Sequence, residues 1–174
     1  MTRAKWHLLL IPVFVHLLFT GYTFNLLPRR IPVHFDLYGA ANRFAPRTIL
    51  IWATPLILAI SLMILIYLSG RAVRWAGRRE PHALSIPHRY NFLKMKGEER
   101  ETYLLKLENH MVLQSLLIWS FFFLIHISLF VSVQDRPVKN PFFLPLFALW
   151  ITLSIYGFIR FYVIRKREFD DDGQ

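Results

Sequence analysis

Four long apolar runs, separated by polar stretches, set the pattern of this chain. They cover about residues 6–27, 48–68, 111–133 and 142–164. The second run holds 21 residues without a charge. At about 1.5 Å of rise per residue, a helix of that length crosses a hydrocarbon core of about 30 Å. Backbone groups in lipid must bond internally, and uninterrupted runs of this length favour helices over barrel strands. The sequence therefore predicts an all-α membrane protein in which residues 1–174 form a single four-span domain, a four-helix transmembrane bundle.

The stretch between the first two runs is polar and has a different period. Apolar and polar residues alternate from Ile31 to Tyr38, which predicts a strand with one apolar and one polar face. His34 and Asp36 would share the polar face, where the carboxylate could orient the imidazole for a metal or a proton. Alternatively, His34 bonds locally and holds the segment against the helix ends.

Two prolines and a glycine shape the same stretch. Pro28 and Pro32 each lack a backbone donor and hold the preceding residue extended, so the first helix should end near Leu27. Gly39 supplies a turn. The sequence therefore predicts a short extended loop over residues 28–47 that caps one end of the bundle.

The spacing of these residues resembles a known motif. Pro-x-x-x-Pro-x-His, followed by Gly five residues after the His, resembles the bacterial domain-of-unknown-function family numbered sixteen forty-eight. The SdpI toxin-immunity and signalling proteins are its best-known members. The matching positions are Leu27, Pro28, Ile31, Pro32, His34 and Gly39. A looser second likeness follows the second run, where Phe92 replaces the family's usual Trp. The resemblance covers roughly residues 6–110. It implies a non-enzymatic protein of the bacterial inner membrane that senses or binds something at its outer face and signals through a cytoplasmic loop.

Composition narrows the function classes. The chain has no Cys, which excludes disulfides and thiolate metal sites. Its net charge of +10 would suit nucleic acid, but the Lys and Arg residues flank apolar runs as membrane-flanking charge does. We therefore expect the lipid bilayer, and not nucleic acid, as the partner.

The same charges predict orientation. Of the 21 Lys and Arg residues, 15 lie in the N-terminal tail, in residues 69–110 and at the C-terminal end. The positive-inside bias then places both termini and the basic loop 69–110 in the cytoplasm, and the loop 28–47 outside. Basic residues between Arg71 and Arg79 suit anionic lipid at the cytoplasmic face. The third helix should begin near Glu98 and project into the cytoplasm.

Apart from His7 at the start of the first run, three histidine or charged residues lie inside the predicted spans: His16, His126 and Arg160. The two histidines could be a haem pair or an interhelical hydrogen bond. Counted from the starts of their runs, they differ by five residues, or about 7 Å of rise, which disfavours a shared haem. Arg160 lies near the cytoplasmic end of its run, where it can reach the headgroups. We expect no cofactor or metal.

No nucleophile–base arrangement or metalloenzyme spacing is recognisable, so we expect no enzymatic activity. An alternative function is an accessory subunit of a larger complex, such as one for electron transfer or pigment binding. The aromatic share of 16% and the scarcity of polar groups in the spans favour lateral packing against other membrane proteins or further copies.

Overall fold

The computed structural model describes residues 5–36, 38–84, 89–134, 145, 147–157 and 159. Arg160 and residues 85–88 of the second motif lie outside these ranges. The elements run in the order η1 (Trp6–Leu9), α1 (Leu10–Phe24), β1 (Arg30–Phe35), β2 (Ala41–Pro46), α2 (Ile49–Trp52), α3 (Thr54–Arg79), η2 (Pro81–Ala83), α4 (Arg89–Lys94) and α5 (Gly97–Gln134).

Within the described residues, three helices are long and apolar enough to cross a membrane: Trp6–Phe24, Thr54–Arg79 and Gly97–Gln134. They confirm a mostly helical membrane protein. A shorter apolar helix, Phe147–Gly157, lies inside the fourth predicted run. The fourth span therefore stays a prediction, because much of residues 142–164 lies outside the described part.

Local sequence explains where the first two spans begin. Pro12 lies in the first turn of α1, just after the 3-10 turn of η1 passes into α-helix. The Thr48 hydroxyl accepts a hydrogen bond from the Ile51 amide, at 3.3 Å, and caps α2. After a break at Ala53, Pro55 lies near the start of α3.

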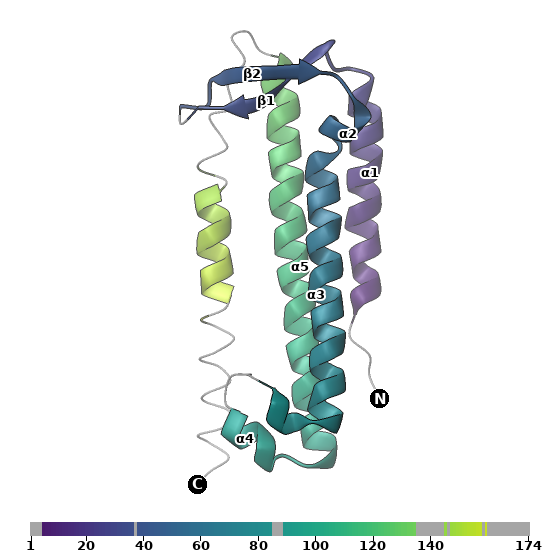
Figure 1. Ribbon diagram of the computed structural model, residues 1–174, viewed down its shortest axis with the longest axis vertical. Coiled ribbons are helices and arrows are strands. Elements are labelled where there is room, and N and C mark those ends of the chain that lie inside the picture. Colours follow the sequence, from purple (N-terminus) through teal and green to yellow (C-terminus); the bar gives the residue numbers. More distant parts are fainter. Residues whose placement is uncertain are drawn as a thin grey trace.

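The two longest helices, α3 and α5, run side by side along the bundle (Figure 1). A helix of 38 residues, the length of α5, measures about 57 Å, well beyond a hydrocarbon core of about 30 Å. One end of the α3–α5 pair must therefore project from the bilayer. The start of α5 carries charge, with Glu98 and Glu99 in its first turn, so this is the end that projects. A start near Glu98 agrees with the prediction from the sequence.

Residues 69–110, expected as a basic loop, are largely helical. They hold the end of α3, then η2 and α4, and the start of α5. Their buried side chains form a small core: Leu84, Phe92, Met95, Tyr103 and Leu104. Gly77 lets α3 approach it, since a Cβ there would lie 2.7 Å from a methyl carbon of Leu104.

A two-stranded antiparallel sheet lies across the other end of the bundle (Figure 1). Ile31 pairs with Ala45 and His34 with Arg43, with register irregularities on either side of His34. The extended segment after Pro28 was predicted, but its return as the second strand, β2, was not. We refer to residues 30–46 as the hairpin.

Candidate functional site

The hairpin carries most of the family-like motif, and its turn is closed by Asp36. The Asp36 side chain accepts hydrogen bonds from the backbone amides of Tyr38 and Ala40, each at 2.9 Å. Gly39 has a φ of 78°, which favours glycine. Asp36 is therefore a turn residue and does not bond to His34.

His34 makes a local cross-strand hydrogen bond. Its Nδ1 lies 2.6 Å from Oδ1 of Asn42, and both side chains are exposed. The predicted alternation of faces is wrong here: Ile31 and Pro32 are both buried, and Val33 and His34 are both exposed. The register irregularities around His34 disrupt the strict period of two that a shared face for His34 and Asp36 requires. The His34–Asn42 bond supports the local-bonding alternative.

Two motif residues anchor the hairpin to the helices. Leu27 and Ile31 are 4% and 2% exposed, and they share a buried cluster with Trp52 of α2 and Val133 of α5. Arg47, just after β2, donates to the backbone oxygen of Leu27 at 2.8 Å and so ties the hairpin to the end of α1. The sequence did not single out Trp52 or Arg47.

A cavity of about 880 Å³ lies between the hairpin and the helix ends. Its volume is in the range of small-molecule sites in proteins. Motif residues Leu27, Pro28 and Pro32 contribute to its wall. The other lining residues are Leu26, Arg29, Arg30, Ala40, Ala41, Phe44, Val133 and Gln134. We call this space the hairpin cavity. Its lining combines apolar residues with two arginines, Arg29 and Arg30, so it suits an amphipathic ligand with an anionic group.

The two intramembrane histidines meet inside the bundle. Nε2 of His16 lies 2.9 Å from Nδ1 of His126, and both residues are fully buried. One ring must carry the proton at the shared position and the other must accept it. The structure thus shows the interhelical hydrogen bond that was one of the two expected arrangements. The predicted difference in depth is wrong, because the two rings lie within hydrogen-bonding distance despite the offset of five residues counted from the starts of their runs.

Aromatic rings surround this pair. The ring centroids of Trp52 and His126 are 4.4 Å apart, and those of Phe123 and His16 are 5.0 Å apart. The Trp52 indole N–H also donates to the Thr23 hydroxyl at 3.0 Å. Trp52 therefore contacts the histidine pair and also belongs to the buried cluster with Leu27, Ile31 and Val133. We call this cluster the hairpin anchor.

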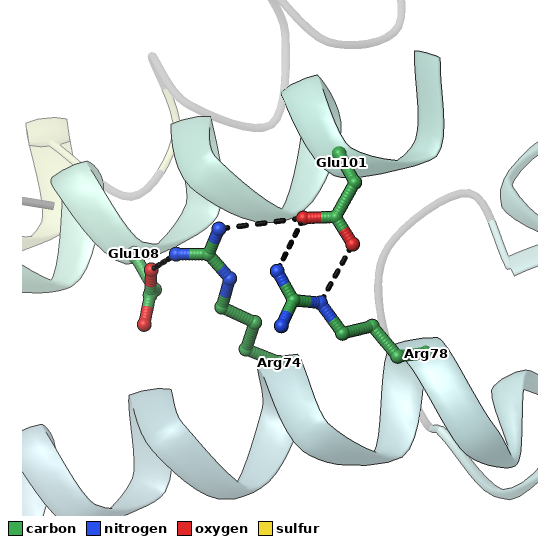
Figure 2. Close-up of polar contacts among 4 residues, drawn as sticks. All are labelled: Arg74, Arg78, Glu101 and Glu108. Carbon is green, nitrogen blue, oxygen red and sulfur yellow. Dashed lines mark hydrogen bonds and ion pairs between the residues drawn. The ribbon is translucent and has the colours of Figure 1, made fainter. Parts of the chain in front are cut away.

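A charge network holds the projecting ends of α3 and α5 together (Figure 2). Arg74 contacts Glu108 at 2.6 Å and Glu101 at 3.3 Å. Arg78 makes two hydrogen bonds to Glu101, each at 2.6 Å.

The sequence predicts anionic lipid as the partner of the basic residues between Arg71 and Arg79. Two of them, Arg74 and Arg78, bond to carboxylates, and lipid contact by this segment stays a prediction. The sequence shows arginines near the end of α3 and glutamates near the start of α5, which could form ion pairs. It does not show that these two helices lie side by side.

Among the described residues, no three His, Asp or Glu side chains gather as a metal site would require. The predicted anchor Arg160 lies outside the described part, so its position stays a prediction.

The comparisons with known proteins agree with the motif. Residues 11–59 match the model of a domain of unknown function (DUF1648). The DUF1648 match begins in α1, includes the whole hairpin and ends in α3. It confirms the resemblance drawn from the motif for this stretch. No curated protein and no solved structure matches the chain.

Proposed function

We propose that this chain is a non-enzymatic protein of the bacterial inner membrane that binds a ligand in the hairpin cavity at its outer face. The observation that carries the proposal is the position of the motif: Leu27, Pro28 and Pro32 all contribute to the cavity wall. Apolar side chains and guanidinium groups bind and orient a ligand but supply no general base. The wall therefore suits binding rather than catalysis.

A continuous set of contacts links the hairpin cavity to the opposite end of the helix bundle, which supports a signalling role like that of the SdpI proteins. Ile31 of the hairpin and Val133 of α5 belong to one buried cluster. From there α5 continues without interruption to Gly97, beside the charge network. A ligand that shifts the hairpin would thus act on one end of a helix whose other end is on the opposite side of the membrane.

The orientation rests on charge. Most Lys and Arg residues lie at the end of the bundle opposite the hairpin or in the two chain termini, which favours a cytoplasmic location for all three. The hairpin cavity would then open on the extracytoplasmic side. Both termini in the cytoplasm require an even number of spans, and the apolar run over residues 142–164 would supply the fourth.

Photo-crosslinking in the native membrane tests the binding site. Benzoylphenylalanine at Ala41, which lines the cavity, should capture a discrete adduct visible by mass spectrometry of the purified chain. The matched control is benzoylphenylalanine at Tyr38, which is 91% exposed in the same hairpin and does not line the cavity. Equal labelling at both positions, or none at Ala41, would contradict the proposal.

An accessory subunit of a larger complex is the second candidate. Large apolar side chains of α1 face outward, with Leu10 71% and Tyr22 72% exposed. Lipid or a partner helix could cover them. Phe121 of α5, in contrast, stacks on Trp150 of the same chain, with ring centroids 4.8 Å apart. Purification in mild detergent separates the two candidates, since a stoichiometric partner protein is expected only of a subunit.

A further inference from the structure

The wall of the hairpin cavity has an apolar part and a positively charged part. Leu26 and Leu27 follow the last turn of α1, and Val133 belongs to the last turn of α5. These residues form an apolar part at the ends of two helices that are long enough to cross the membrane. Arg29 and Arg30 follow directly in the chain and contribute positive charge to the same wall.

The charge in this wall is not neutralised within the described part of the chain. Asp36, the acidic residue of the hairpin, accepts hydrogen bonds from backbone amides of the turn and forms no ion pair with Arg29 or Arg30. Arg47 is used by backbone oxygens at the end of α1. None of the described ion pairs includes Arg29 or Arg30, and Arg30 makes only a long contact, 3.5 Å, to the backbone oxygen of Phe44. An anion in the cavity would therefore meet two available guanidinium groups.

The depth of the cavity points to the source of that anion. Helices that cross a bilayer end near the headgroups, where phosphates lie between water and the acyl chains. A ligand at this depth can place an anionic group against arginine and a hydrocarbon chain against Leu26 and Phe44, the apolar lining residues that are exposed. Both parts of such a ligand are present in an anionic phospholipid.

A bound peptide fits the hairpin less well. Peptides commonly bind a sheet by adding a strand to a free edge, which needs a continuous row of backbone donors and acceptors. Pro32 interrupts the donors of β1, and Pro46 closes β2 without a donor. Both strands are only six residues long.

We propose that the hairpin cavity binds an anionic phospholipid, with its phosphate at Arg29 and Arg30 and an acyl chain against the exposed apolar lining residues Leu26 and Phe44. This inference rests on the proposed function and names the ligand class of that site. Binding would make the hairpin responsive to the lipid composition of the surrounding leaflet.

Native mass spectrometry of the full chain in mild detergent tests this proposal. The protein is given an equimolar mixture of phosphatidylglycerol and phosphatidylcholine, and the retained adducts are counted. We expect phosphatidylglycerol adducts to dominate. Because each basic residue near an anionic surface contributes about 1 kcal/mol, Arg29→Gln with Arg30→Gln should lower their occupancy at least about fivefold. Arg29→Lys with Arg30→Lys should retain most of it.

The control is Arg43→Gln, which removes one positive charge, against two in the test variant, from β2 at a position that does not line the cavity. It should leave the preference for phosphatidylglycerol unchanged within about twofold, since rim charge away from the phosphate contributes little. Glycerophosphoglycerol, the headgroup without acyl chains, should fail to displace the lipid. Equal retention of both lipids, an equal effect of Arg43→Gln or displacement by the free headgroup would overturn the proposal.

Failure of the lipid proposal can be distinguished from failure of the binding site itself. A peptide adduct on benzoylphenylalanine at Ala41, without a lipid preference, would overturn the phospholipid and leave a ligand-binding hairpin cavity. The absence of both an adduct and a lipid preference would overturn both proposals.

Discussion

His16 and His126 show how two residues far apart in the chain can fix the position of two helices. Each is a costly polar group in an apolar span unless it finds a partner. Their hydrogen bond of 2.9 Å supplies that partner and sets α1 at one height against α5. His16 Nδ1 and His126 Nε2 have no hydrogen-bond partner in the described part of the chain, so the shared contact is the main polar gain.

We expect His16→Ala and His126→Ala each to destabilise the protein by about 1–3 kcal/mol, from lost packing and an orphaned imidazole. The double variant should lose less than the sum, with a coupling energy of about 1 kcal/mol, as for interhelical hydrogen bonds in membranes. Thermal unfolding in detergent measures all three. His7→Ala is the control because His7 is exposed and outside the pair. Strict additivity would mean that the two rings do not interact.

At the scale of elements, the hairpin depends on attachments to helices rather than on its own pairing. A two-stranded sheet alone is marginally stable in water. This one is held by the buried Leu27 and Ile31 and by Arg47, which donates to the backbone oxygens of Leu27 and Phe24. Arg47 thus binds carbonyls that the end of α1 would otherwise leave to water.

We expect Arg47→Gln to loosen the hairpin while leaving the helices intact. Losing a charged donor to two carbonyls should cost about 1–2 kcal/mol locally. Hydrogen exchange read by mass spectrometry should then be faster over residues 30–46 and unchanged in α5. Arg43→Gln removes the same charge from the hairpin without this contact and should leave exchange as in the unaltered protein. Faster exchange throughout the chain would instead indicate global destabilisation.

At the scale of the whole molecule, α5 is held to other elements toward both of its ends. The histidine pair and the hairpin anchor lie toward one end, and the charge network lies toward the other. The Arg74 and Glu108 side chains are only 14% and 4% exposed, so they are poorly screened by water. Arg78 is 45% exposed and contributes far less.

Removing one partner of the buried pair should therefore be costly. We expect Glu108→Ala to destabilise the protein by about 3 kcal/mol, because Arg74 would keep a buried charge with only a weaker contact to Glu101. Arg78→Ala should cost at most about 1 kcal/mol. Replacing both Arg74 and Glu108 by Leu should recover much of the loss, since no buried charge remains. Equal losses for Glu108→Ala and Arg78→Ala in chemical unfolding would show that burial does not decide the energy.

The sequence by itself determined the features that depend on neighbours along the chain. Apolar runs of sufficient length specified the three described spans, and Glu98 marked the start of α5. The first helix ends at Phe24, three residues before the end near Leu27 that Pro28 predicted. Proline and glycine spacing also located the hairpin segment and its family likeness. These signals are local, because backbone geometry and hydrophobic length are read over a few turns.

Only the tertiary structure decided which distant residues meet. The matching depth of His16 and His126, the return of the hairpin as β2 and the pairing of Arg74 with Glu108 all depend on how helices slide and face one another. No residue spacing encodes that offset, since it results from packing many side chains at once. The cavity is of the same kind, because its wall joins the hairpin to the ends of α1 and α5, and residues far apart in the chain meet there.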